Sequence, residues 1–292
     1  MFLNSLNVII GSQLARSLRC CPASQDTVEE VLAACSSSVA LSSQVTRLGG
    51  LETVVRSLGR EEGLEERLLR LVGCLCSGEV TRLPAQLLPS LLNILEDAGR
   101  GEEVRREAVG VLAQITAARP GLQAHFLPFL TENLQHILGA VHSLVLTTSS
   151  HETFLLCAAS LSNMTSITNQ TSLSILSTSL LPNLLSHPAI TTENTSVYIL
   201  EQMVTLVNNL AREPLMSGLP LTGCVQFLLE LLLLGRQRPD NTELYSATHR
   251  TVSKAVIGNS YGLNTLMVRP FTSEQNKADR VKYAHCCLAW LR

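Results

Sequence analysis

The 292-residue chain has few aromatic and few charged residues. Phe, Trp and Tyr make up 4% of it, and Asp, Glu, Lys and Arg make up 16%, whereas about 25% of an average globular domain is charged. Apolar residues still account for 46% of the chain, which excludes disorder over most of its length. Leucine is the dominant apolar residue. Leucine-rich chains with few aromatics are typical of stacked helices, whose interdigitating layers favour medium-sized aliphatic side chains.

Several signals of other protein classes are also missing. None of the nine cysteines lies in a CxxC pattern with zinc-like spacing, and the chain is too long to need disulfide cross-links, so a reducing compartment is expected. Residues 1–18 lack a basic start and a sustained apolar core, so no signal peptide is predicted. The strongest apolar run, residues 227–234, is too short to span a bilayer.

Lysine and arginine are absent from residues 120–211, a stretch rich in Ser, Thr and Asn that carries four glutamates. Residues 1–119 carry 12 basic and 14 acidic residues, and residues 212–292 carry 10 and 6. The formal net charge of −2 gives no reason to expect general attraction to nucleic acid or membranes. The middle stretch has two interpretations: a solvated polar surface, or a surface that contacts a partner's backbone.

Long helical patterns recur along the chain, separated by breakers such as Gly49-Gly50, Pro120-Gly121 and Pro214. One series comprises residues 28–41, 65–77, 103–116, 152–165, 197–211, 243–257 and 278–292. A second, leucine-rich set comprises residues 51–58, 87–95, 134–146, 173–185 and 225–234. No alternating pattern of useful length predicts a β-strand.

The first series aligns on one polar position, occupied by Cys74, Gln114, Asn163, Asn209 and approximately Asn259. The steps of 40 to 50 residues match armadillo and HEAT arrays, whose repeats of roughly 40–47 residues contain two or three helices. We therefore predict an all-α, armadillo/HEAT-like, right-handed superhelical α-solenoid of about five to six repeats. Residues 1–26 would form a helical lead-in and residues 27–292 the armadillo-repeat domain, which the sequence predicts to be truncated at its C-terminus.

Gln114, Asn163 and Asn209 form the best candidate partner-binding site. An armadillo superhelix exposes its third helices along a groove, where a carboxamide can donate to a peptide carbonyl and accept from a peptide N–H of an extended partner. Gln202 and Thr205 share the helix face of Asn209 and are secondary candidates. The alternative is that these amides bond carbonyls within the stack.

Enzyme signals are weak, and no catalytic residue, cofactor or metal is predicted. The seven histidines lack HExxH or other ligand spacing, and neither a Gly-rich phosphate loop nor a GxSxG motif occurs. Cys157 lies on an apolar stripe with Phe154, Leu161 and Met164, so its thiol is predicted to be shielded and its pKa raised. An enzymatic interpretation would need this thiol to be reactive. The triplet Asn163-Met164-Thr165 is interpreted as a chance glycosylation motif.

The pattern Ala-x-Leu-x-Asn in residues 159–163 resembles the end of an armadillo third helix. Five stretches then resemble consecutive repeats of the Inscuteable family, in order and with similar spacing: GGLETVVRSL (49–58), EEVRREAVGVLAQIT (102–116), HFLPFLTENLQHIL (125–138), HETFLLCAASLSNMT (151–165) and EQMVTLVNNLA (201–211). The resemblance extends from about residue 40 to residue 212. Beyond it, the chain is similar only to armadillo repeats in general.

The resemblance to Inscuteable implies a non-enzymatic adaptor at the cytoplasmic cell cortex, acting in spindle orientation and asymmetric cell division. Such proteins link Pins-type (LGN) tetratricopeptide proteins to the Par complex through the scaffold Bazooka. Binding of a Bazooka-type scaffold fits the repeats. Binding of a Pins-type protein is expected only if an upstream segment is present, because residues 1–40 show no convincing counterpart of the family's Pins-binding segment.

The alternative function is that of a cargo receptor of the karyopherin type. Import receptors of this fold pair each ladder Asn with a Trp four residues earlier, and this chain has Ala159 and Thr205 there. The missing Trp residues argue against a receptor for basic nuclear signals. Neither nucleic acid as a partner nor a transmembrane segment is expected.

Overall fold

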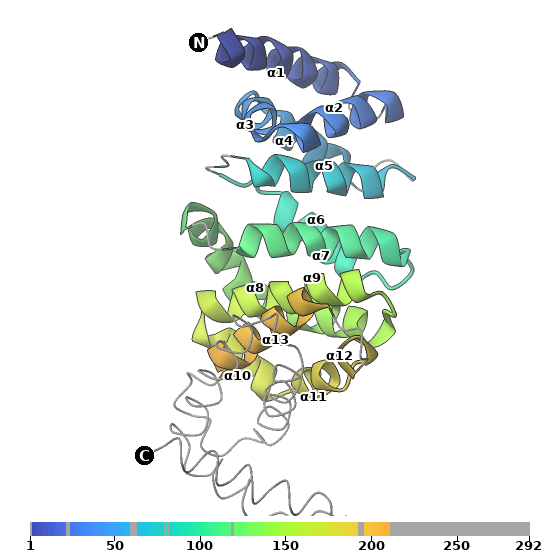
Figure 1. The fold of residues 1–292 in the computed structure, drawn as a ribbon, viewed down its shortest axis with the longest axis vertical. Coiled ribbons are helices and arrows are strands. Elements are labelled where there is room, and N and C mark those ends of the chain that lie inside the picture. The colour runs from blue at the N-terminus through green and yellow to red at the C-terminus, as the bar shows by residue number, and fades with distance from the viewer. Residues whose placement is uncertain are drawn as a thin grey trace, which may run out of the picture. The chain divides into compact units, whose positions relative to one another are not determined.

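The computed structural model describes residues 2–21, 24–58, 63–78, 80, 82–117, 120–191 and 196–210, most of which are helical (Figure 1). The helices are α1 (Phe2–Cys20), α2 (Gln25–Ser37), α3 (Val39–Arg47), α4 (Gly50–Ser57), α5 (Glu65–Ser77), α6 (Leu87–Glu96), α7 (Glu102–Thr116), α8 (Pro120–Thr147), α9 (His151–Ile167), α10 (Asn169–Leu176), α11 (Leu180–Leu185), α12 (Pro188–Thr191) and α13 (Val197–Leu210). No β-strand occurs among the residues described. The predicted all-α solenoid is confirmed.

The chain divides into two compact units, residues 1–206 and 207–292. All the helices named above belong to the first unit, except for the last four residues of α13. The helices predicted at 225–234, 243–257 and 278–292 lie outside the described residues. The predicted division into residues 1–26 and 27–292 stays a prediction.

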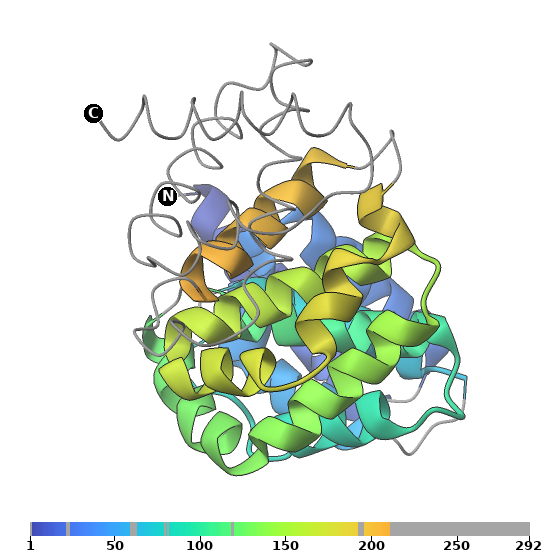
Figure 2. The same ribbon diagram turned by 90° about the horizontal axis from the view of Figure 1, so that it is seen from below.

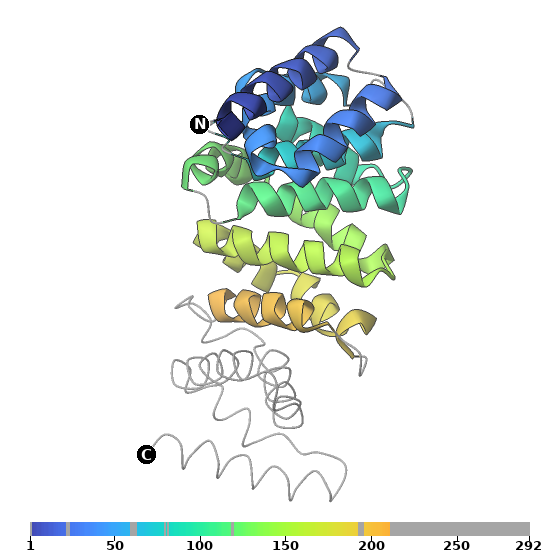
Figure 3. The ribbon, with the colours of Figure 1, turned by 45° about the horizontal axis from the view of Figure 1, so that its top comes forward.

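Within the first unit, the helices α2, α5, α7 and α9 pack in succession, and each runs parallel to the one before it (Figures 1 and 3). The direction follows from contacts near both ends of α7 and α9: Arg106 pairs with Glu152 near the helix starts, and Asn163 bonds Ala113 near the helix ends. Seen from below, successive helices of this unit overlap as the layers of a stack do (Figure 2).

The repeat length varies along this stack. Arg70 on α5 meets Glu107 on α7 after 37 residues, and Ser36 on α2 meets Cys74 on α5 after 38. The bond from Asn163 on α9 back to α7 spans 50 residues. The longer repeat contains α8, which has 28 residues. These contacts join helices 37 to 50 residues apart, a range close to the predicted steps of 40 to 50 residues.

The core of the first unit consists of aliphatic stripes that successive helices bury against one another. In α5 the residues Leu68, Leu69, Leu71, Val72 and Leu75 have no exposed surface. Each such side chain contributes roughly 1.5–3 kcal/mol when buried, and one repeat cannot bury its stripe alone. Contacts between neighbouring repeats therefore stabilise the fold.

Serine interrupts one predicted helix. Residues 28–41 were expected to form a single helix, but α2 ends at Ser37 and α3 begins at Val39. Between them, Ser38 is extended (φ −151°, ψ 110°), and its hydroxyl accepts a hydrogen bond from the Leu41 N–H at 3.4 Å. A serine hydroxyl that satisfies a free N–H favours a helix start over helix continuation, so the single-helix prediction was wrong here.

Of two leucine-rich predictions, one is confirmed and one differs from the structure. The segment predicted at 134–146 is the part of α8 that follows a kink at Asn133 (φ −115°, ψ 17°). The segment predicted at 173–185 is divided into α10 and α11. There Ser177 and Thr178 donate their hydroxyls to carbonyls of the preceding turn, at 3.0 and 3.1 Å. Such bonds compete with helix continuation, and apolar periodicity does not reveal them.

Candidate partner-binding face

Each long helix of the first unit buries one side and leaves another side partly or fully exposed. We call the outward side of α5, α7, α9 and residues 197–206 of α13 the long-helix face. Figures 1 and 3 show α7, α9 and α13 side by side. The predicted site residues Gln114, Asn163, Gln202 and Thr205 lie on the helices of this face. Asn209 lies in the second unit and is half-buried.

Gln114 and Asn163 are neighbours on adjacent helices, but their environments differ. Gln114 is exposed and forms no hydrogen bond within the described residues. Asn163 is half-buried, and its Nδ2 donates to the Ala113 carbonyl at 3.1 Å and to Thr116 Oγ1 at 3.4 Å. The donor half of the Asn163 amide therefore connects α9 to the end of α7. Only its acceptor, Oδ1, is left for a partner.

The secondary candidates lie on α13. Gln202 is half-buried, whereas Thr205 is exposed and donates its hydroxyl to the Glu201 carbonyl at 2.8 Å. That bond leaves the Thr205 oxygen able to accept one further hydrogen bond. Gln202 and Thr205 can thus offer polar atoms to an extended chain lying on α13.

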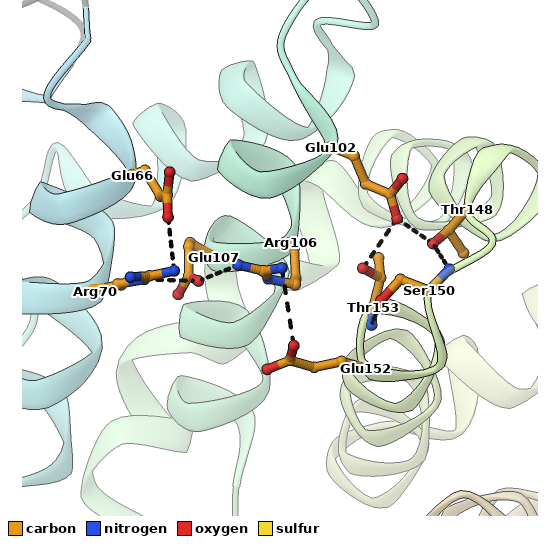
Figure 4. A network of polar contacts seen from close by, with 9 residues as sticks. All are labelled: Glu66, Arg70, Glu102, Arg106, Glu107, Thr148, Ser150, Glu152 and Thr153. Atoms are coloured by element: carbon orange, nitrogen blue, oxygen red, sulfur yellow. Dashed lines mark hydrogen bonds and ion pairs between the residues drawn. The ribbon is translucent and has the colours of Figure 1, made fainter.

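A row of ion pairs crosses the long-helix face from α5 to α9 (Figure 4). Arg70 pairs with Glu66 at 2.7 Å and with Glu107 at 3.1 Å. Arg106 also pairs with Glu107 at 3.1 Å and lies 3.9 Å from Glu152 on α9. Exposed ion pairs are worth at most about 1 kcal/mol each, so the row orders side chains more than it stabilises the stack.

Arg106 stays charged in this row despite its partial burial. Burial by itself would lower the pKa of its guanidinium. The hydrogen bond and charge of Glu107, together with the charges of Glu152 and Glu103, outweigh that effect and raise the pKa above its usual value. The arginine is therefore a permanent positive charge between α7 and α9.

A second polar cluster fixes where α9 begins (Figure 4). Glu102, at the start of α7, accepts hydrogen bonds from the hydroxyls of Thr148 and Thr153. Thr148 Oγ1 accepts from the Ser150 N–H at 3.0 Å, and Ser150 Oγ accepts from the Thr153 N–H at 3.3 Å, as an N-cap does. The cluster positions α9, and with it Asn163, relative to α7.

The ion-pair row was not predicted from the sequence. Its signal is present, however: charged residues recur at Arg70, Arg106 and Glu152, which are 36 and 46 residues apart. These intervals are close to the repeat steps seen between helices. A search for charged positions at the repeat spacing, in addition to amides, would have found them.

Cys157 is a core residue, as predicted. Its side chain and those of Phe154, Leu161 and Met164 have no exposed surface. Burial raises the pKa of the thiol to about 12, although the nearby charge of Arg105 acts in the opposite direction. A thiol with so high a pKa is a poor nucleophile at neutral pH.

Within the described part of the chain, no three His, Cys, Asp or Glu side chains lie close enough to hold a metal ion. His187 is 8% exposed and stacks on Phe154, with ring centroids 4.3 Å apart. Its Nδ1 accepts from the Ala189 N–H at 3.1 Å, so its Nε2 donates to the Thr148 carbonyl at 3.2 Å. This histidine therefore supports the junction between α8, α9 and α12.

No described helix is both long and apolar enough to cross a membrane.

Comparison with known proteins gives a family match and two curated relatives. The family model described as "Protein inscuteable C-terminal" matches residues 62–261. The mouse protein inscuteable homolog is 40% identical over 75 residues, which are 26% of this chain and 13% of the mouse protein. The human protein inscuteable homolog is 28% identical over 168 residues, which are 57% of this chain and 29% of the human protein. The chain thus matches less than a third of the length of either relative.

Solved structures confirm the fold. An engineered protein superposes with a TM-score of 0.64 at 15% identity, covering 85% of this chain and 98% of its own. A designed armadillo repeat protein superposes with a TM-score of 0.61 at 17% identity, covering 83% of this chain and 98% of its own. At such low identity these similarities establish the armadillo-like fold alone.

Proposed function

The chain belongs to the inscuteable C-terminal family, and we propose that it acts as a non-enzymatic adaptor linking cortical polarity proteins to the spindle-orientation machinery in asymmetric cell division. Family membership and the armadillo-like solenoid support a protein-interaction adaptor. The specific link from polarity proteins to the spindle is what the sequence resemblance to the Inscuteable family implies.

The observation that carries the proposal is the open polar surface of the long-helix face. Gln114 is exposed, Thr205 is exposed, and Asn163 keeps Oδ1 available after its donor half has bonded to α7. An extended peptide presents N–H and C=O groups that can bond such side chains. Each bond contributes about 0.5–1.5 kcal/mol, so several must form together to give useful affinity.

In this proposal, a segment of a Bazooka-type polarity scaffold lies along the long-helix face, in the groove expected of armadillo repeats. Gln114, Asn163, Gln202 and Thr205 contact it, and a contact by Asn209 of the second unit stays a prediction from the sequence. A Pins-type protein would require a segment outside these repeats. Action at the cytoplasmic cell cortex follows from such partners.

The test is a binding titration of this chain with a purified Bazooka-type scaffold. One triple variant removes polar groups from the long-helix face: Gln114→Ala, Gln202→Ala and Thr205→Ala. The control triple variant removes similar groups from α6, from the residue that precedes it and from α8: Asn93→Ala, Gln86→Ala and Thr131→Ala. Thr131 is exposed and bonds the carbonyl four residues earlier, as Thr205 does.

The face variant should bind at least about tenfold more weakly, because three bonds of about 0.5–1.5 kcal/mol are lost, and the control variant should bind like the wild type. Circular dichroism confirms that each variant is folded. Equal affinity of a folded face variant and the wild type would disprove binding on this face. A wild-type chain without affinity for the scaffold would disprove the adaptor proposal.

A further inference from the structure

The cation-free stretch, residues 120–211, supplies α9 and α13 of the long-helix face with carboxylates but with no positive charge of its own. Glu152 on α9 has a side chain that is 70% exposed, and its ion-pair partner Arg106 is 3.9 Å away. Arg106 lies closer to Glu107, at 3.1 Å. Glu152 is therefore held weakly and remains accessible.

The arginines at this face already have carboxylate partners. Arg67 pairs with Glu29 at 3.0 Å, Arg70 pairs with two glutamates, and Arg106 pairs with Glu107. Glu103 is exposed and Glu201 is half-buried, and neither forms an ion pair among the described residues. Among the described residues, the face consequently carries surplus negative charge that a cation can neutralise.

Tyr198 adds an independent feature to this part of the face. It is 68% exposed, more than any other large apolar side chain in the described part of the chain. It lies on α13, one helical turn before Glu201 and Gln202. It follows Glu152 by 46 residues, the interval that separates Arg106 from Glu152. Tyr198 thus follows Glu152 at the same sequence interval at which Glu152 follows Arg106.

An exposed aromatic ring beside carboxylates favours one class of occupant. A guanidinium group can stack on a tyrosine ring and pair with a carboxylate at the same time. A purely apolar partner would bury Glu152 and Glu201 without a counter-charge, which is costly. A second copy of the chain approaching with its own α9 and α13 would bring further negative charge and no cation, because residues 120–211 contain neither Lys nor Arg.

We propose that α9 and α13 of the long-helix face bind an arginine-containing extended segment of a protein partner. One guanidinium stacks on Tyr198, and neighbouring basic side chains pair with Glu152 and Glu201. The inference rests on the proposed function, since it specifies the chemistry of the segment that the face receives. It adds Tyr198, Glu152 and Glu201 to the predicted amide positions.

The test uses three fluorescein-labelled decapeptides, in which arginine, lysine or glutamate alternates with serine. Fluorescence anisotropy measures their affinity for the intact chain. The arginine peptide should bind best, the lysine peptide several-fold more weakly, and the glutamate peptide not measurably. Affinity for the arginine peptide should fall as salt increases, because the attraction is between exposed charges.

Four variants locate the binding. Tyr198→Ser should weaken binding of the arginine peptide by about 3- to 30-fold, and Tyr198→Phe, which keeps the ring, should bind like the wild type. Glu152→Gln should weaken it by about 2- to 5-fold. The control Glu132→Gln removes the same charge from an exposed glutamate on α8, in the same cation-free stretch, and should change affinity less than 1.5-fold.

The inference is overturned if the arginine peptide does not bind, if the glutamate peptide binds equally well, or if Glu132→Gln weakens binding as much as Glu152→Gln. These failures are distinct from failure of the adaptor proposal. A scaffold that binds the wild type and not the folded face variant, combined with no affinity for the arginine peptide, would uphold the adaptor and refute this inference.

Discussion

Two regions of the first unit hold their helices together with different polar chemistry. From α2 to α7, ion pairs join successive helices, as between Arg67 and Glu29 and between Arg70 and Glu107. From α8 onwards, uncharged groups do so: Ser160 Oγ donates to the Val109 carbonyl at 3.3 Å, and Gln135 donates to Ser174 at 3.2 Å. The absence of Lys and Arg from residues 120–211 explains the change.

This difference shows that the solenoid does not depend on one kind of polar contact. Both regions bury similar aliphatic stripes, and those stripes supply most of the free energy of folding. The polar contacts decide instead which side chains stay available to bind a partner. In the ion-paired region Arg67, Arg70 and Arg106 each pair with a glutamate, whereas α9 and α13 leave carboxylates and amides open.

The largest expected effect comes from breaking the core that both regions share. Phe154→Ala should lower the free energy of unfolding by about 3–5 kcal/mol, because it creates a large cavity and removes the stack with His187. Leu71→Ala in α5 is the matched substitution in the other region and should cost about 2–5 kcal/mol. Urea denaturation measures both. A loss below about 1 kcal/mol at either site would contradict a common core.

Buried thiols in α2 and α9 test whether the cores of the two regions are equally shielded from solvent. Burial raises the pKa of Cys35 in α2 and of Cys157 in α9 from 9.0 to about 12, with the neighbouring Cys74 adding to the effect at Cys35. At pH 8 both should resist a thiol reagent in the native state, while the exposed Cys20 and Cys21 react. Mass spectrometry of labelled peptides gives the rates, and fast labelling of Cys157 would contradict its burial.

The same shifts set the sign of a pH dependence. A thiol that keeps its proton in the folded state and loses it in the unfolded state favours unfolding at high pH. The contribution of Cys35 and Cys157 to stability is therefore constant below pH 9 and falls as the pH rises from 9 towards 12. Unfolding of the Cys157→Ala variant should depend less steeply on pH in that range.

The amide connection between α7 and α9 should have an intermediate effect. Asn163→Ala removes one of the donors to the Ala113 carbonyl, which keeps the Ala117 N–H and Thr116 Oγ1, and should cost about 0.5–1.5 kcal/mol of stability. Gln114→Ala, on the neighbouring exposed amide, should change stability by less than about 0.5 kcal/mol. Equal costs at the two positions, measured by urea denaturation, would show that the two amides have the same role.

The smallest effect belongs to the ion pairs. A double-mutant cycle with Arg70→Met and Glu107→Gln should give a coupling free energy of about 0.2–1 kcal/mol that decreases with added salt. A coupling above about 2 kcal/mol that is insensitive to salt would mean that the ion pairs, and not the core alone, hold α5 against α7.

Helices whose apolar stripe is continuous were predictable to within a few residues. The segment predicted at 65–77 is α5, and those at 103–116 and 152–165 are contained in α7 and α9. Predictions failed where hydroxyl side chains compete for backbone groups, at Ser38 and around Ser177 and Thr178. Apolar periodicity reports burial but does not report which local hydrogen bonds a serine will form.

For the candidate site, the sequence placed Gln114, Asn163, Gln202 and Thr205 on the long helices. It did not determine which hydrogen bonds these side chains form within the stack. Whether Asn163 donates to α7 or to a partner depends on how closely the last turn of α7 approaches α9. That distance is set by the packing of side chains between the two helices. The orientation of Asn163 towards Ala113 is therefore a tertiary result.

The sequence by itself determined the helical class, the repeat step and the lack of positive charge in residues 120–211, because each of these is a periodicity or a composition along one chain. The tertiary structure alone decided which charges became partners and which stayed open. Glu107 meets both Arg70 and Arg106, whereas Glu152 is left 70% exposed. Partner choice depends on distances of a few ångströms between helices that lie 37 to 50 residues apart in the chain, and only packing fixes those distances.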